Sequence, residues 1–177
     1  MNPGSQSESD PHNRKFIIGY GNIDRQDDGV AWHVLDRLLE QLGHPPVDPF
    51  EQPVIECSPW LTILYALQLT PEMAEMIAKF DQVCYVDAHT GAIKEPLHVE
   101  KLIAENVNSP FTHHLPPAAS LYLAQTIINK QIDGLLVSIQ GHEFGFDRSL
   151  SPTTSELVEQ AIIMIFDWIN KKNNLNP

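Results

Sequence analysis

The side chains best suited to chemistry in this sequence are carboxylates and imidazoles that stand near the ends of predicted strands. Asp27 and Asp28 form an adjacent pair, Asp87 directly follows the apolar run CYV, and His113 and His114 lie in a proline-flanked loop. Imidazole together with carboxylate suits a borderline divalent ion such as Ni(II) or Zn(II) better than calcium or magnesium. These residue types therefore raise the hypothesis of a metal site.

Each of these residues also has an ordinary structural explanation. Asp27 or Asp28 can cap the helix that follows, where the helix dipole favours a carboxylate, and capping needs only one of them. Asp87 can satisfy a turn, and His89 shares its side of the chain only if the strand continues. A lone histidine is more often a surface or core residue than a ligand. The residues alone leave both explanations open.

Two other kinds of chemistry are disfavoured. Gly19 and Gly21 match the first glycines of the dinucleotide fingerprint GxGxxG, but Asp24 stands where the third glycine belongs, and nearby acidic residues would repel a pyrophosphate. His142 and Glu143 form a further polar cluster after a strand. The sequence contains no HExxH or GxSxG motif, so it lacks the usual hydrolase signatures.

Strand-like and helix-like segments alternate along the chain and must position these side chains. Apolar runs predict strands at 15–21, 54–57, 82–87, 97–105 and 133–140. Helical spacing and length predict helices at 28–42, 60–69, 70–80, from about 117 to 130, and from 153 to about 169, with Thr70 capping one helix and Thr153 and Glu156 forming a capping box. This alternation predicts an α/β layered fold with a largely parallel sheet, in which ligands gather at the carboxyl ends of the strands.

Length and composition predict one domain. The 177 residues, 42% of them hydrophobic, are enough for a sizeable core, and no long linker divides the middle of the chain. We expect a disordered leader at 1–14, a single α/β domain at 15–171 and a flexible tail at 172–177. Cys57 and Cys84 form no CxxC pair and indicate no disulfide framework.

The acidic charge and the lack of long apolar runs limit the classes of binding partner that we expect. A net charge of −12 repels phosphate backbones, so we expect no nucleic acid partner, whereas a basic peptide or a metal cation would be favoured. No apolar run is long enough to span a bilayer, and the polar start of the chain does not read as a secretory signal. We therefore expect a cytoplasmic protein without a membrane partner.

Four motifs, in the order in which they occur, resemble the hydrogenase maturation endopeptidase family. They are GYGNIDRQDDGV, VDAHTG, THHL and, after a glycine-bearing loop, LSPTTSELVEQAI. Members of that family carry a G-x-G-N strand end followed by D-[DE]-x-x-G, a strand ending in Asp-Ala, a histidine loop before a helix, and a Leu-Ser/Thr-Pro entry to the last helix. The similarity runs from about Phe16 to about Ile169, which is nearly the whole predicted domain.

The resemblance implies a fold, an activity and a set of site residues. The implied fold is a three-layer αβα sandwich, and the implied activity is removal of the C-terminal extension of a NiFe hydrogenase large-subunit precursor after nickel insertion. Asp28, Asp87 and His113 would be both the metal ligands and the catalytic residues of this aspartyl-type peptidase, and Asp27 would be left to cap or turn. The nickel would be carried by the substrate, although zinc or cadmium could occupy the site in vitro. The expected partner is the precursor.

Some positions depart from the family pattern. Ala31 stands where members usually keep a second glycine, the loop HTGAIKEPLH replaces a glycine-containing one, and His114 replaces a different polar residue. These changes touch the expected substrate cleft. They keep open an alternative hypothesis, a non-catalytic metal- or peptide-binding module on the same fold.

Overall fold

The computed structural model describes residues 13–106 and 115–171. Most of the predicted leader, all of the predicted tail, and both His113 and His114 lie outside the described residues. In chain order the elements are β1 (Lys15–Tyr20), the 3-10 segment η1 (Ile23–Gly29), α1 (Val30–Gln41), β2 (Val54–Ser58), β3 (Leu61–Ala66), η2 (Pro71–Met73), α2 (Ala74–Ile77), β4 (Gln82–His89), β5 (Leu97–Leu102), α3 (Pro117–Ile128), β6 (Asp133–Gln140) and α4 (Pro152–Asn170).

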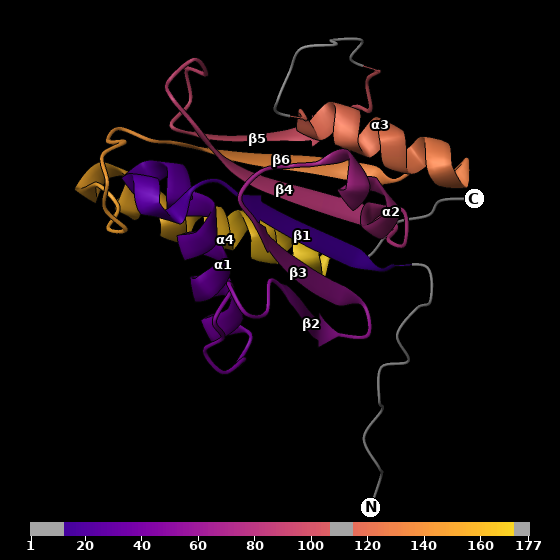
Figure 1. The fold of residues 1–177 in the computed structure, drawn as a ribbon, viewed down its shortest axis with the longest axis horizontal. Helices are drawn as coiled ribbons and strands as arrows, with labels where there is room; N and C mark the ends of the chain where they lie inside the picture. The colour runs from indigo at the N-terminus through magenta and orange to yellow at the C-terminus, as the bar shows by residue number, and fades with distance from the viewer. Residues whose placement is uncertain (1–12, 107–114, 172–177) are drawn as a thin grey trace, which may run out of the picture.

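One mixed sheet forms the middle layer. Its strand order is β2-β3-β1-β4-β6-β5, and the four inner strands run parallel to one another. The two edge strands, β2 and β5, run antiparallel to their neighbours. The carboxyl ends of the inner strands therefore meet at one edge, on the left of Figure 1, where they face η1 and the loop from β6 to α4.

Alternate strand residues build two separate cores, one on each face of the sheet. On β1, Ile17 packs in the core with α1 and α4, whereas Phe16 and Ile18 pack in the core with α2 and α3. This division follows from the two-residue period of a strand. The sheet thus lies between two helical layers (Figure 1), and the predicted three-layer αβα sandwich with a largely parallel sheet is confirmed.

The prediction of a helix at 60–69 is wrong, because most of this segment is strand β3. All of Leu61–Ala66 is buried, and β3 pairs with β1 on one side and β2 on the other. A strand covered on both faces has a continuous apolar run rather than an alternating one, and such a run looks like a buried helix. The predicted strands at 54–57 and 97–105 are confirmed as β2 and β5.

Two predicted helix starts also differ from the structure. The segment after Thr70 forms only η2 and the short α2, and the Thr70 side chain makes no capping hydrogen bond. Ser151, rather than Thr153, caps α4: its side chain accepts a hydrogen bond from the Thr154 N–H, and Pro152 occupies the first helical position. Proline is favoured there because its missing N–H would have had no partner. None of the described helices is long and apolar enough to cross a membrane.

Candidate functional site

A tight turn after β1 brings Asp28 back to the edge of the sheet. Gly21 adopts a φ of 138°, and a Cβ added to it would lie 2.0 Å from the carbonyl oxygen of Asp28, so no other residue fits here without a shift of the backbone. The backbone N–H of Asn22 donates a hydrogen bond to Oδ2 of Asp28 at 2.9 Å. A backbone N–H group of the turn therefore holds the Asp28 carboxylate in place.

Asp87 lies near the carboxyl end of β4, and β1 supplies one of its hydrogen-bond donors. The hydroxyl of Tyr20 donates to Oδ2 of Asp87 at 2.7 Å, and the N–H of Ala88 donates to Oδ1 at 2.7 Å. Burial raises the pKa of Asp87 to about 6, the negative charge of Asp28 adds to this rise, and the two hydrogen bonds oppose it. Asp28 is therefore close enough for its charge to influence the ionisation of Asp87.

The two carboxylates are held by consecutive parts of one turn. Tyr20 binds Asp87 and Asn22 binds Asp28, with Gly21 between them. The negative charge of Asp28 raises the pKa of Asp87, and a cation between the two carboxylates would favour their ionised forms. Asp28 and Asp87 both lie near the carboxyl edge of the sheet, and two such carboxylates could contribute to binding a divalent cation.

The third predicted ligand, His113, lies outside the described residues, as does His114. Within residues 13–106 and 115–171, no three histidine, cysteine, aspartate or glutamate side chains come together as a metal-binding group. The metal-binding role of Asp28, Asp87 and His113 stays a prediction.

His89 lies on the same face of the strand as Asp87, because β4 continues through it. Its Nδ1 accepts a hydrogen bond from the Gly91 N–H at 3.2 Å. Its Nε2 is buried and has no hydrogen-bond partner among the residues that the structure describes. A nitrogen that accepts carries no hydrogen, so the ring hydrogen lies on Nε2. In this arrangement the imidazole presents a donor rather than a free ligand nitrogen.

Asp27 has a different role from its neighbour. Its buried carboxylate accepts hydrogen bonds from the Ser151 N–H (2.7 Å) and hydroxyl (2.6 Å), from the Thr154 hydroxyl (2.8 Å), and from the N–H groups of His142 (2.8 Å) and Glu143 (2.9 Å). Burial alone would raise its pKa, but these hydrogen bonds outweigh burial and lower the pKa to about 2.

Asp27 therefore joins the start of α4 to the loop after β6. It does not cap its own helix, since α1 begins after Gly29 with no side-chain capping bond. His142 and Glu143 belong to this junction mainly through their backbones. Their side chains are exposed, and that of Glu143 accepts a hydrogen bond from the Gln26 amide.

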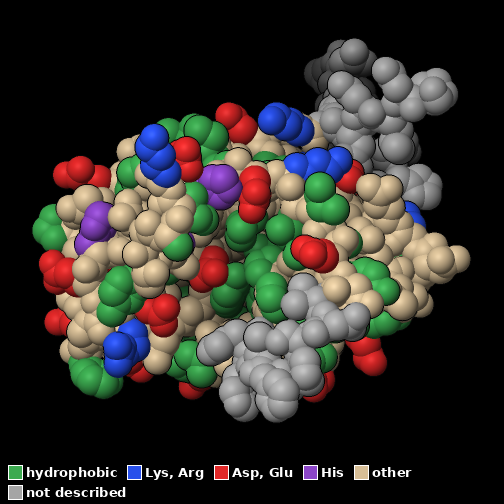
Figure 2. Space-filling view, turned by 90° about the horizontal axis from the view of Figure 1, so that it is seen from above, with side chains coloured by type: hydrophobic (Ala, Val, Ile, Leu, Met, Phe, Trp, Pro, Cys, Tyr) green, Lys and Arg blue, Asp and Glu red, His purple; other side chains and the backbone are tan. Residues whose placement is uncertain are grey.

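The glycine turn is not arranged as a phosphate cradle. The Gly21 N–H donates to the carbonyl oxygen of Ala66, and the Asn22 N–H is taken by Asp28. A pyrophosphate site needs such N–H groups free to point at the ligand. The face in Figure 2 also shows more acidic than basic side chains. Both features disfavour nucleotide binding.

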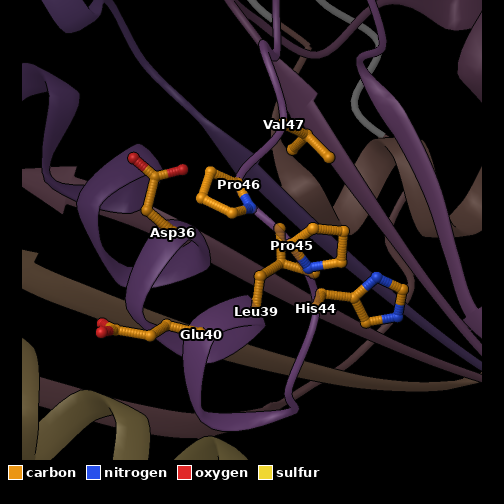
Figure 3. Close-up of a pocket in the computed structure, with 7 residues that line it drawn as sticks. All are labelled: Asp36, Leu39, Glu40, His44, Pro45, Pro46 and Val47. Atoms are coloured by element: carbon orange, nitrogen blue, oxygen red, sulfur yellow. The ribbon is translucent and has the colours of Figure 1, made fainter.

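A cavity of about 500 Å³ lies elsewhere, between the C-terminal half of α1 and the loop that follows it. Figure 3 shows Asp36 and Glu40 on the helix side and the ring of His44 on the loop side. The Tyr65 hydroxyl donates to Asp36 at 2.6 Å, and Arg37 pairs with Glu40 at 2.6 Å. Asp36 therefore accepts a hydrogen bond and Glu40 has an ion-pair partner, and both lie beyond the start of α1, away from Asp28.

Two residues that hold the site were not found from the sequence. Tyr20 has no signal of its own, because only the register of β1 beside β4, with Gly19 opposite Val86, brings its hydroxyl to Asp87. Asn22 contributes through its backbone, which any residue type carries. Its side chain, however, caps η1 by accepting a hydrogen bond from the Asp24 N–H. The sequence does carry a signal for this cap, because asparagine is favoured directly before a helical turn.

The fold is similar to that of several solved maturation proteases. The HycI protease from Thermococcus kodakarensis matches with a TM-score of 0.61 and 22% identity, over 90% of this chain and 94% of that one. The HybD endopeptidase from E. coli matches with a TM-score of 0.58 and 21% identity, over 88% and 91% of the two chains. A further endopeptidase from Escherichia coli matches with a TM-score of 0.59 and 22% identity, over 87% and 90%.

No protein-family model and no curated protein sequence matches the chain. In each structural comparison, the similar region nevertheless spans almost the whole length of both chains. The chain therefore has the α/β fold of the hydrogenase maturation endopeptidases.

Proposed function

We propose that the protein is a cytoplasmic endopeptidase that removes the C-terminal extension of a NiFe hydrogenase large-subunit precursor after nickel insertion. The observation that carries this proposal is the pair of carboxylates, Asp28 and Asp87, at the carboxyl edge of the sheet. Support also comes from the fold, since solved proteins that share it are described as hydrogenase maturation endopeptidases and proteases.

The chemistry of the pair explains how loading with nickel could control cleavage. Nickel enters as part of the substrate, still attached to the precursor. Asp28 and Asp87, with His113 as the third ligand, would take positions on that ion which the precursor leaves open. Without the nickel ion, no positive charge would offset the two carboxylates, so their negative charge would oppose binding of the precursor. Binding would therefore depend on a loaded precursor.

Tyr20 and Asn22 keep the two carboxylates in place during this step. Each donates one hydrogen bond to one carboxylate oxygen. Both oxygens of Asp87 accept one hydrogen bond, the second from the Ala88 N–H, and each oxygen keeps a further lone pair that a cation could use. A metal bound at such a site can polarise the scissile carbonyl or activate a water molecule. The positions of the carboxylates are set by the protein before substrate arrives.

Three substitutions test the assignment. We expect Asp28→Asn, Asp87→Asn and His113→Ala each to reduce processing at least a hundredfold, because each removes a ligand while keeping similar side-chain volume or less. Circular dichroism and the thermal midpoint should show a folded protein. The measurement is the C-terminal mass of a nickel-loaded precursor over time.

Asp133→Asn is the matched control. This exposed aspartate lies at the opposite end of the sheet, paired with Lys101 at 3.6 Å, and its substitution should leave processing unchanged. Wild-type rates in all three site variants would overturn the assignment. Binding of the loaded precursor without any shortening would instead indicate the non-catalytic module.

A further inference from the structure

The exposed aromatic rings are confined to one region of the described surface. Among the large apolar side chains exposed there, only Phe50 and Phe146 are aromatic, and they are 61% and 89% exposed. An arginine lies over each ring: Arg25 is 4.8 Å from the centroid of Phe146, and Arg148 is 5.5 Å from that of Phe50. Asp24, which precedes Arg25, pairs with Arg148 at 2.6 Å and joins the two halves. We call these five residues the aromatic–arginine strip.

The strip is held rigidly beside the proposed site. On either side of Phe146, the Gly145 N–H donates to the Gln26 side chain at 2.6 Å, and the carbonyl of Asp147 accepts from the Gln26 N–H at 2.7 Å. Gln26 adopts a φ of 50° to make these contacts, a strained backbone that persists only where surrounding structure enforces it. An exposed ring is thus displayed on a fixed loop.

The two arginines are not equivalent in charge. The Asp24 carboxylate neutralises Arg148, whereas in the part of the chain that the structure describes no carboxylate pairs with the Arg25 guanidinium. In a chain of net charge −12, such a cation creates a local preference for an anionic group. Arginine is also among the residues most enriched at the energetic centres of protein interfaces, and phenylalanine is enriched in interfaces generally.

We propose that the aromatic–arginine strip binds the C-terminal extension of the precursor, with Arg25 pairing a carboxylate of the extension and Phe146 covering an adjacent apolar side chain. Arg25 and Asp28 both lie on η1, and Gln26 between them holds the loop that carries Phe146. A peptide bound at the Asp28–Asp87 pair would therefore have the strip within reach. This inference rests on the proposed function and identifies where that function recognises its substrate.

The test separates recognition from chemistry. Steady-state processing of nickel-loaded precursor should show that Arg25→Gln and Phe146→Ser each raise KM roughly tenfold, with kcat within about twofold of wild type. The same precursor, with the carboxylates of its extension converted to amides, should be processed with an equally raised KM by wild type. Arg25→Gln should then cause no further loss with this substrate.

Two distant changes are the controls. Arg37→Gln removes the same charge on the outer side of α1, and Ile163→Ser removes an exposed apolar side chain on α4; both should keep wild-type KM. An unchanged KM in Arg25→Gln and Phe146→Ser, with wild type active, overturns this inference alone. If wild type binds the precursor without cleaving it, and Arg25→Gln weakens that binding, the result contradicts the proposed cleavage and supports the proposed role of the strip in binding. Neither binding nor cleavage by wild type overturns both.

Discussion

Asp27 and Asp28 are adjacent in sequence, but their surroundings give them opposite properties. Five hydrogen bonds engage the carboxylate of Asp27 and hold its pKa near 2. Among the described residues, Asp28 accepts a hydrogen bond from the Asn22 N–H, and its negative charge raises the pKa of Asp87. At the residue scale, the first aspartate maintains the shape of the site and the second is available to a ligand.

Replacing Asp27 should therefore destabilise the whole protein. In wild type, buried hydrogen-bond donors bind the Asp27 carboxylate. In Asp27→Asn, an amide NH2 group would face some of these donors, so we expect the free energy of unfolding to fall by about 3 kcal/mol. Urea denaturation followed by circular dichroism measures this change. The exposed Asp24→Asn should lose less than about 1 kcal/mol. Equal stability of the two variants would contradict the role of Asp27.

Asp87 should make the metal-free protein less stable as the pH rises. Its folded pKa of about 6 exceeds its ordinary value of 3.8, so the folded state binds more protons than the unfolded state between these values. The contribution of Asp87 to the free energy of unfolding is therefore fully present below pH 4. It is lost as the pH rises to about 6, by an amount on the order of 3 kcal/mol. Unfolding measured from pH 4 to pH 7 should show this slope in wild type. The slope should be absent in Asp87→Asn, and its persistence there would assign it to another group.

At the scale of elements, the turn between β1 and η1 sets the distance between the two carboxylates. Gly21→Ala would place a methyl group against the Asp28 carbonyl and force the turn open, so we expect a loss of about 3 kcal/mol and loss of processing. Gly43 is the matched control. It also has a positive φ, 76°, but its added Cβ meets nothing within 4 Å, so Gly43→Ala should cost only about 1–2 kcal/mol and keep processing. Processing by Gly21→Ala at the wild-type rate would show that the turn is not needed.

The sequence predicted the elements well where local signals decide them. The helix after Asp28 and the strand before Asp87 follow from helical spacing and from an apolar run, and their order led to the correct sheet edge. Strand β3 was mistaken for a helix because burial on both faces removes the alternation that identifies a strand. The bond from Tyr20 to Asp87 depends on strand register, and the contacts of Asp27 join residues more than a hundred positions apart. Neither can be read from local sequence.

At the scale of the whole molecule, the proposed recognition site and the proposed catalytic site lie at the same edge of the sheet. The loop after β6 reaches η1 through Asp27 and Gln26, so the aromatic–arginine strip and the Asp28–Asp87 pair belong to a single rigid region. Arg25 is a half-buried cation that pairs with no carboxylate among the described residues, in a chain with 23 acidic and 11 basic residues.

The most direct test of the central claim compares a nickel-loaded hydrogenase large-subunit precursor with the same precursor free of nickel. Each is incubated with the wild-type protein, and intact mass spectrometry follows the precursor's C-terminus. We predict that only the loaded precursor loses its C-terminal extension, and that Asp28→Asn abolishes this loss. An unchanged mass of the loaded precursor, or equal shortening of both precursors, would contradict the account.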